Sequence, residues 1–181
     1  IMEKCVNFLT YSFDGYSKAY YEAEIMEDVY DKGKLMGVFA ENTAEALQFT
    51  RKAQDEFALT SLDRALKASE DGTFSNEIEP VTVKIGKEVC RISSDEQLRN
   101  ARPDKIPNLK PAFTTDGTVT AANSSSISDG AAALVVMRLS EAEKQYCKPL
   151  AVIRAHATHA AEPEWFTTAP IGAINKVIQK A

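Results

Sequence analysis

Three cysteines are the side chains of this sequence best suited to nucleophilic chemistry, because a thiolate attacks an acyl carbon readily. Cys5 stands in Glu-Lys-Cys-Val-Asn-Phe, without the glycine-rich helix start that would favour the thiolate. Cys90 is expected on a strand of a hairpin, and Cys147 directly after a short helix. An odd number of cysteines without metal-ligand spacing is typical of reduced thiols in a cytosol. We therefore interpret all three as structural or incidental thiols and assign no catalytic residue.

Two histidines, His156 and His159, lie three residues apart in Arg-Ala-His-Ala-Thr-His-Ala. On a helix, this spacing would place both imidazoles on one face, where they would suit a metal ion. The stretch continues a predicted strand into a loop, however, and no cysteine or carboxylate pattern completes a set of ligands. We therefore expect no metal site. The sequence also shows no glycine-rich phosphate loop and no Ser-His-Asp arrangement.

The run from Gly117 to Ala133 indicates binding rather than catalysis. It joins a strand-like segment, 118–121, to a turn of small polar residues and then to a Gly-Ala segment. Residues this small leave the backbone open, so that a ligand can approach it closely. The stretch 93–111 is locally positive within an acidic chain, and such a cluster can favour an anionic ligand.

The composition is that of an ordinary globular protein: 44% of the 181 residues are hydrophobic, 26% are charged, and the net charge is −5. A chain of this length can bury one sizeable core or two small ones. The acidic balance argues against nucleic acid as a partner. No apolar run approaches the ~20 residues that span a bilayer, and the N-terminus shows no signal-peptide pattern. We therefore expect a cytoplasmic protein that binds neither nucleic acid nor a membrane.

Two helices are predicted in the first half of the chain. Apolar residues recur at helical spacing over 36–47. Thr50 can cap a second helix, which Asp71-Gly72 ends, and the two helices would form an αα-hairpin. The aromatic residues within 1–34 are expected to pack a small core or, in the alternative, to mark an interface. The buried stripe of the second helix is predicted to consist of Ala53, Phe57, Ala58, Leu62, Ala65 and Leu66.

A β-hairpin is predicted after these helices. Val81, Val83 and Ile85 alternate with polar residues and precede the turn residues Gly86-Lys87. The stretch 93–111 contains three prolines and is expected to be an ordered loop without a regular element.

The last third of the chain is predicted to contain two helices among short strands. Ser140 and Glu143 form a capping box for a brief helix. Pro170 starts the final helix, with Thr167 or Thr168 as its cap. The order of all these elements indicates an α/β fold with an appended α+β segment. A short strand is predicted over 119–122, a short helix entry followed by a buried strand over 131–138, and another buried strand over 149–155.

Five segments occur in the order in which the thiolase family carries them, and the chain resembles this family of acyl-CoA acetyltransferases. Residues 35–42 are similar to the family's Met-Gly-x-x-Ala-Glu-Asn helix start, and residues 51–58 to its Arg-x-x-Gln-Asp-x-(Phe/Tyr)-Ala helix. The other three segments are 109–113, the Gly-Thr-Val-Thr-Ala-Ala-Asn-Ser-Ser loop at 117–125, and 168–173. One such segment could arise by chance, but five in the family's order could not.

The resemblance implies an α/β fold, a partial thiolase fold that is an internal portion lacking both catalytic ends. Residues 1–112 would be the loop domain, built of helices plus a β-hairpin, which makes most contacts with coenzyme A (CoA). Residues 113–147 would be the end of the N-terminal thiolase half, and residues 148–181 the start of the C-terminal half. These last two parts would be β-α-β-α pieces of the two halves.

Thiolases of this kind transfer an acetyl group between acetyl-CoA molecules, by Claisen condensation or its thiolytic reverse, in fatty acid metabolism. The chemistry needs a nucleophilic cysteine, a histidine, a second cysteine and oxyanion holes. In the family, the nucleophile lies upstream of the matched part, and the Asn-Glu-Ala-Phe, Gly-His-Pro and Cys-x-Gly-Gly-Gly motifs lie downstream. The resemblance thus implies a CoA-binding part that is inactive alone. Its implied partners are acyl-CoA or CoA and the missing thiolase segments or another chain.

The alternative function is a non-catalytic CoA-binding or interaction module, left by a truncated or split thiolase. In both cases the CoA thioester is a substrate or ligand, and no separate cofactor is implied.

Five residues match family positions that contact CoA. Ser125 matches the loop serine that contacts the pantetheine arm, and Ala121 a small residue that leaves room for it. Met36 and Phe113 match apolar walls of the tunnel, although both would also suit a plain core. Arg99 matches a cation near the nucleotide end of CoA, where arginine can stack on adenine or pair with phosphate, or it is a solvated loop residue.

Two positions depart from the family pattern. Leu35 stands where many members have a histidine before the Met-Gly pair, which puts any role of that histidine in doubt for this chain. Leu62 stands where potassium-dependent members carry a tyrosine, so we expect no bound potassium ion.

Overall fold

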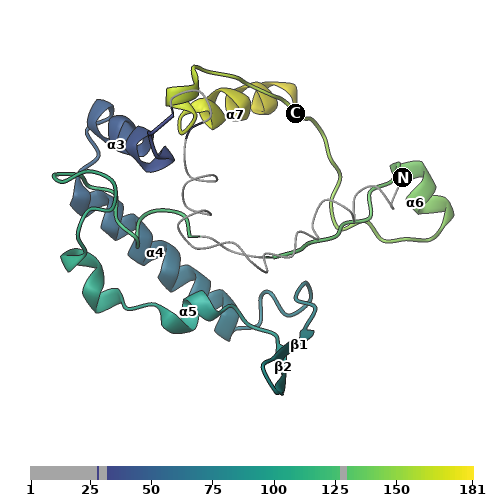
Figure 1. The fold of residues 1–181 in the computed structure, drawn as a ribbon. Coiled ribbons are helices and arrows are strands. Elements are labelled where there is room, and N and C mark those ends of the chain that lie inside the picture. Colours follow the sequence, from purple (N-terminus) through teal and green to yellow (C-terminus); the bar gives the residue numbers. More distant parts are fainter. Residues whose placement is uncertain (1–27, 29–31, 127–129) are drawn as a thin grey trace. The chain divides into compact units, whose positions relative to one another are not determined.

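The computed structural model describes residue 28 and residues 32–126 and 130–181 (Figure 1). The chain divides into two compact units. One unit spans residues 44–125, and the other combines the chain up to Thr43 with residues 126–181. The aromatic residues within 1–34, which were expected to pack a small core, lie outside the described residues.

Helices α3 (Met36–Ala46) and α4 (Arg51–Glu70) confirm the two predicted helices. The boundary between the two units lies within α3. Thr50 caps α4 as expected, because its Oγ1 accepts a hydrogen bond from the N–H of Ala53 at 3.2 Å. This bond satisfies one of the free backbone donors in the first turn of the helix.

The end of α4 is fixed by a local turn at Asp71. Its Oδ1 accepts hydrogen bonds from Oγ1 of Thr73 at 2.6 Å and from the N–H of Thr73 at 2.9 Å. The side-chain bond first, and then the backbone bond, lower the pKa of the Asp71 carboxyl, because both favour its charged form. Gly72 lies between these residues with φ +78°, which glycine adopts without strain.

The predicted buried stripe of α4 is wrong. Phe57 is 78% exposed and Ala53 is also exposed, while the other four residues of the stripe are half-buried. The buried residue of α4 is a charged one, Asp55. The apolar core of this unit is too small to cover the apolar face of a 20-residue helix. Its buried apolar residues, among those described, are Ala44, Ile106 and Val119.

Strands β1 (Val81–Ile85) and β2 (Glu88–Ile92) form the predicted antiparallel hairpin. Val83 pairs with Cys90, so this cysteine lies on a strand as expected. The two-residue connection begins with Gly86 at φ +64°, a left-handed conformation that matches the twist of the paired strands.

Residues 93–111 are not a loop throughout, contrary to the expectation. They contain helix α5 (Glu96–Asn100) and a 3-10 helix, η1 (Pro103–Asn108). Both elements contact α4, and Ile106 of η1 is buried. Elements this short have little stability of their own, so contact with α4 stabilises them more than any local sequence pattern does.

In the second unit, the part of α3 up to Thr43 contacts the residues that precede the last helix, α7 (Ala169–Lys180). Phe39 is 2% exposed, and its ring meets that of Phe166 edge-on with 6.4 Å between ring centroids. The hydroxyl oxygens of Thr43 and Thr167 lie 2.6 Å apart and share a hydrogen bond. An aromatic pair and a part-buried hydroxyl pair thus connect segments that are distant in the sequence.

Helix α6 (Leu139–Lys144) confirms the predicted brief helix, but its predicted capping box is wrong. The helix begins two residues earlier than predicted, after Arg138, and no side chain caps it. Ser140 therefore lies inside the first turn, where its hydroxyl does not stand at the capping position.

The start of α7 is also as predicted, with Pro170 in its first turn. Thr168 occupies the N-cap position, as predicted for one of the two threonines, but neither threonine hydroxyl caps the helix, because both have other partners. Thr168 precedes the helix, but its Oγ1 donates to the carbonyl of Trp165, in η2 (Pro163–Trp165), at 3.0 Å. Thr167 shares its hydrogen with α3, as described above.

The three strands predicted over 119–122, 131–138 and 149–155 are wrong. Residues 121–123 form a turn, and neither of the other two segments is a strand. A strand needs the backbone of a neighbouring strand as its hydrogen-bond partner, and no described segment pairs with these two. The β1–β2 hairpin is therefore the only sheet within the part of the chain that the structure describes.

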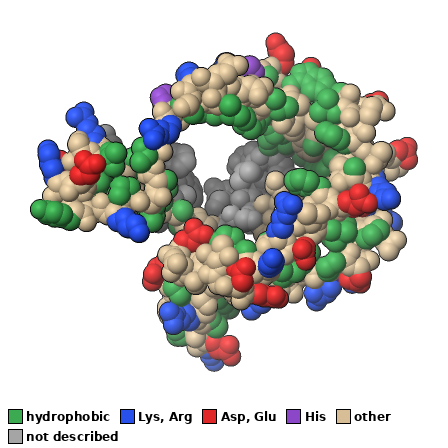
Figure 2. Space-filling view, turned by 180° about the vertical axis from the view of Figure 1, so that it is seen from behind, with side chains coloured by type: hydrophobic (Ala, Val, Ile, Leu, Met, Phe, Trp, Pro, Cys, Tyr) green, Lys and Arg blue, Asp and Glu red, His purple; other side chains and the backbone are tan. Residues whose placement is uncertain are grey.

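The same two segments carry apolar side chains at the surface, and Figure 2 shows apolar side chains exposed on the molecule. Leu134 is 84% exposed and Leu150 is 99% exposed.

We predict that the chain self-associates through the segments 131–138 and 149–155, because exposed apolar surface favours burial in a complex. The double variant Leu134→Lys with Leu150→Lys should remain smaller than the unaltered chain in sedimentation velocity at equal concentration. The control is Thr60→Lys, at an exposed polar position. A sharp melt of an unaltered monomer that does not depend on concentration would contradict the prediction.

Candidate functional site

The loop 117–125 closes into a turn whose centre is buried. Thr120 is fully buried, and Val119 is 5% exposed. The carbonyl of Thr120 accepts two hydrogen bonds from Ser124, one from its N–H at 3.1 Å and one from its Oγ at 2.7 Å. Oγ1 of Thr120 accepts another from the N–H of Ala122 at 3.3 Å. The turn is therefore held from inside by both the backbone and the side chain of Thr120.

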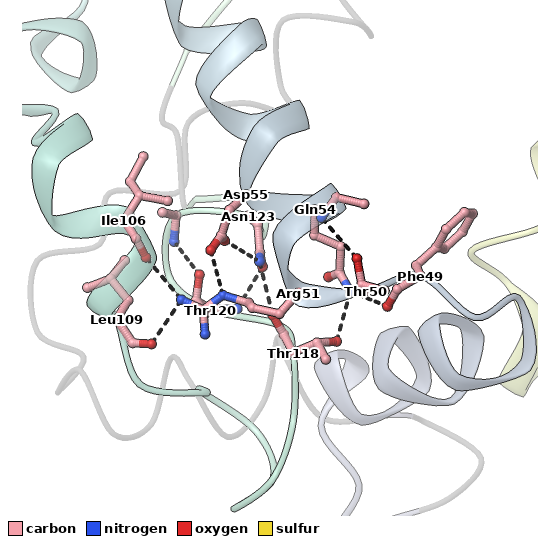
Figure 3. Close-up of polar contacts among 12 residues, drawn as sticks. Phe49, Thr50, Arg51, Gln54, Asp55, Ile106, Leu109, Thr118, Thr120 and Asn123 are labelled. Atoms are coloured by element: carbon pink, nitrogen blue, oxygen red, sulfur yellow. Dashed lines mark hydrogen bonds and ion pairs between the residues drawn. The ribbon is translucent and has the colours of Figure 1, made fainter.

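Asn123 connects this turn to α4 through its side-chain amide (Figure 3). Its Oδ1 accepts a hydrogen bond from the N–H of Thr120 at 2.7 Å. Its Nδ2 donates to the carbonyl of Thr118 at 3.0 Å and to Oδ1 of Asp55 at 3.1 Å. Both amide hydrogens and the amide oxygen are thus used.

Asp55 lies between Asn123 and a cation. Its Oδ2 accepts a hydrogen bond from Nε of Arg51 at 2.8 Å, four residues earlier on α4. Nη2 of Arg51 also donates to the carbonyls of Ile106 at 2.9 Å and Leu109 at 3.0 Å. Asp55 is only 6% exposed, and a buried carboxylate is tolerated when it is paired and hydrogen-bonded in this way. α4 therefore anchors both the turn and the end of η1.

Gln54 makes a second connection between α4 and the loop. Its Nε2 donates to Oγ1 of Thr118 at 2.8 Å and to the carbonyl of Phe49 at 3.1 Å (Figure 3). The segments 51–58 and 117–125, which the sequence singles out separately, are therefore in direct contact.

The structure places the predicted CoA-binding residues in both units. Ala121 and Ser125 are exposed on the turn that Asn123 holds. Phe113 is half-buried in the segment just before the loop, and Arg99 is exposed in the last turn of α5. Met36, the first residue of α3, is 39% exposed and belongs to the other unit. One turn thus carries two of the five residues, and the unit 44–125 carries four.

The described thiols lie apart from this turn in the sequence and take no part in its hydrogen bonds. Cys90 is half-buried on β2, and Cys147 is exposed after α6, as expected for both. Cys5 lies outside the described residues. The Sγ of Cys147 lies 3.8 Å from the carbonyl oxygen of Gln145.

His156 and His159 are exposed and do not lie on a helix. Nδ1 of His159 lies 3.2 Å from Nζ of Lys176, which as an ammonium group donates the hydrogen bond. Among the residues that the structure describes, no group of three or more His, Cys, Asp or Glu side chains could hold a metal ion.

From the sequence, Arg51, Asp55 and Asn123 were singled out only as members of the family segments 51–58 and 117–125, with Asp55 also placed early in its helix, and none was assigned to the site. One signal was present for the first two, because an acidic residue that follows an arginine by four positions on a helix suggests an ion pair. No comparable signal was present for Asn123, because its partner on α4 lies 68 residues away.

Comparison with known proteins identifies the family. Residues 9–140 match the family described as thiolase, N-terminal domain. The chain belongs to the thiolase family. This thiolase chain is 44% identical over 150 residues to acetyl-CoA acetyltransferase of Rhizobium meliloti (strain 1021), which covers 82% of this chain and 38% of that protein. It is 46% identical over 158 residues to mitochondrial acetyl-CoA acetyltransferase of Bos taurus, which covers 86% and 37%.

The fold agrees with that membership. The crystal structure of Bacillus anthracis acetyl-CoA acetyltransferase matches with a TM-score of 0.84 and 38% identity, over 89% of this chain and 41% of that chain. The helices and the small sheet described above are therefore part of an α/β thiolase fold. The chain spans less than two fifths of the length of the two curated relatives named above. None of its described helices combines the length and apolarity needed to cross a bilayer.

Proposed function

We propose that this thiolase chain is the CoA-binding central part of an enzyme that transfers an acetyl group between acetyl-CoA molecules, by Claisen condensation or its thiolytic reverse. The observation that carries the proposal is the contact between α4 and the 117–125 turn, which leaves Ala121 and Ser125 at the surface. The names of the relatives, which are acetyl-CoA acetyltransferases, support the same class of substrate.

The residues on this turn suit the pantetheine arm, a flexible chain with two amide groups. Ala121 has only a methyl group and leaves room for the arm, and the hydroxyl of Ser125 can donate to or accept from an amide. Phe113 and Met36 would supply apolar contact along the arm. Arg99 would pair with a phosphate or stack on adenine at the nucleotide end.

The proposal also assigns the parts of the chain. Residues 1–112 are the loop domain, 113–147 the end of the N-terminal half and 148–181 the start of the C-terminal half. A cytoplasmic location belongs to the same proposal, with unpaired cysteines in its favour. CoA thioesters are the partners in this account, together with the remaining thiolase segments or another chain.

The second candidate function is a non-catalytic CoA-binding or interaction module. It is favoured by the positions of the described thiols, because neither Cys90 on β2 nor Cys147 after α6 lies on the turn that carries Ala121 and Ser125. Reading the DNA on both sides of this reading frame separates the two candidates. An upstream cysteine segment and downstream motifs would support the enzyme, and early stop codons would support the module.

We predict weak binding of CoA by this 181-residue chain, with a Kd on the order of 0.1–1 mM, because the turn supplies only part of a tunnel wall. Ala121→Leu should weaken binding at least roughly tenfold, because its side chain would occupy the space proposed for the arm. The control is Ala161→Leu, at an exposed alanine outside the run 117–133. Isothermal titration calorimetry tests both. Sub-micromolar affinity would contradict the expected weakness, and an equal effect of the two substitutions would contradict the assigned site.

We also predict that this chain alone neither forms nor cleaves acetoacetyl-CoA, because neither described thiol, Cys90 on β2 or Cys147 after α6, has the surroundings of an activated nucleophile. A spectrophotometric assay of thiolysis should stay at background. Turnover clearly above background that Cys147→Ala abolishes would contradict this prediction, since Cys147 is an exposed thiol of the chain.

A further inference from the structure

Arg51, Asp55 and Asn123 form a continuous chain of hydrogen bonds that ends at the turn carrying Ala121 and Ser125 (Figure 3). This series of hydrogen bonds starts at the carbonyls of Ile106 and Leu109, to both of which Arg51 donates. It therefore connects the turn to two other elements of the unit, α4 and η1.

The turn depends on this chain at two points. The Asn123 amide bonds the N–H of Thr120 and the carbonyl of Thr118, which precede Ala121. The carbonyl of Thr120 then holds Ser124, which precedes Ser125. The residues immediately before both exposed side chains are thus fixed by bonds that begin at Asn123 or Thr120. A rotation of the Asn123 amide would change the direction of both.

Charge and hydrogen-bonding capacity make Asp55 the critical member. An ionised carboxylate only accepts hydrogen bonds, and each of its oxygens faces a donor, Arg51 on one side and Asn123 on the other. An asparagine at this position has nearly the same shape but carries an amide NH2 in place of one oxygen. That NH2 would face another donor, whichever way the amide is turned.

We propose that Arg51, Asp55 and Asn123 are positioning residues, which hold the 120–124 turn in the one conformation that presents Ala121 and Ser125 to the pantetheine arm of CoA. The part that concerns CoA rests on the proposed function. The proposed role requires no contact between these side chains and the ligand, because each acts through its hydrogen bonds to protein groups.

The test compares three variants of the full chain. Asp55→Asn places donor against donor. The double exchange Asp55→Asn with Asn123→Asp restores a donor facing an acceptor between the two positions, while the bond to the Thr118 carbonyl stays lost. Glu56→Gln is the control, because it alters the neighbouring exposed pair with Lys52, at 3.7 Å, on the same helix. Far-UV circular dichroism verifies that the helices are retained in each variant.

Two readouts are taken. Amide hydrogen exchange at Thr120, measured without ligand, reports the bond that Asn123 accepts. CoA affinity comes from the chemical shifts of Ala121 and Ser125 during a titration with CoA. We expect Asp55→Asn to speed amide exchange at Thr120. It should also lower the affinity for CoA by roughly tenfold to a hundredfold, as for loss of a hydrogen bond to a charged group. The double exchange should recover part of both effects, and Glu56→Gln should change neither.

The outcomes separate the two proposals. Unchanged Thr120 exchange in Asp55→Asn would overturn the positioning role, whether or not CoA binds. Faster exchange with unchanged CoA affinity would overturn it as well, because a loosened turn would then bind equally well. If millimolar CoA causes no change in the chemical shifts of the turn in the unaltered protein, the proposed function is overturned. The ligand-free exchange rates of the variants would still test the positioning role of Arg51, Asp55 and Asn123.

Discussion

Replacing Asp55 with alanine is expected to lower the free energy of unfolding of the 44–125 unit by roughly 3 kcal/mol, as when one partner of a buried ion pair is removed. The substitution leaves the guanidinium of Arg51 without its carboxylate and one amide hydrogen of Asn123 without its acceptor. An unpaired polar group in a buried place keeps its desolvation penalty and gains nothing in return. The loss should therefore exceed that of an ordinary surface ion pair several-fold.

The same helix offers a matched control. Lys52 and Glu56 also lie four residues apart, with 3.7 Å between Nζ and Oε1, but their side chains are 85% and 65% exposed. Glu56→Ala should therefore change the unfolding free energy by less than about 0.5 kcal/mol, since solvent screens such pairs. Amide hydrogen exchange within α4, measured at increasing urea concentrations, gives the unfolding free energy of both variants. Similar losses for Asp55→Ala and Glu56→Ala would contradict a structural role of the buried pair.

Replacing Gly172 with alanine is expected to destabilise the unit that contains α7 by roughly 1–3 kcal/mol, as overpacking does. At an exposed helical position the same change would stabilise a protein by about 1 kcal/mol, so the predicted sign is opposite to helix propensity. The cause is steric. A Cβ on Gly172 would overlap the ring of His159, with Nε2 only 2.6 Å away.

The ring of His159 is not free to swing aside without loss of contacts. Nζ of Lys176 lies 3.2 Å from its Nδ1 and donates to the carbonyl of Thr158 at 3.3 Å. Lys180 donates to the carbonyl of His156 at 3.3 Å, which also holds this segment against α7.

A second substitution isolates this steric cause. In a His159→Ala background the ring is absent, so Gly172→Ala should become neutral or stabilising. Thermal unfolding of the two single variants and the double variant gives the coupling between the sites. Purely additive effects would contradict the predicted overlap.

The sequence predicted elements whose stability is local. The helical spacing over 36–47, the Thr50 cap and the Gly86 turn each depend on residues within a few positions, and the structure confirms them. The strands at 131–138 and 149–155 failed for the opposite reason. Valine-rich segments become strands only where another strand supplies hydrogen-bond partners, and the described residues supply none.

The candidate site divides in the same way. Ala121 and Ser125 were predicted from the resemblance of the loop to the thiolase family, because consecutive residues carry that motif. Their support was not, because the bond between Asn123 and Asp55 joins residues 68 positions apart. On α4, apolar periodicity predicted that residues such as Phe57 are buried. The buried residue is instead Asp55, and Phe57 is exposed.

Titration of the isotope-labelled chain with CoA, followed by NMR, tests whether the turn held by α4 is a wall of the CoA site. We predict saturable shifts at the amides of Ala121 and Ser125, with a Kd on the order of 0.1–1 mM. Shifts confined to other parts of the chain, or no response of the turn at several millimolar CoA, would contradict it.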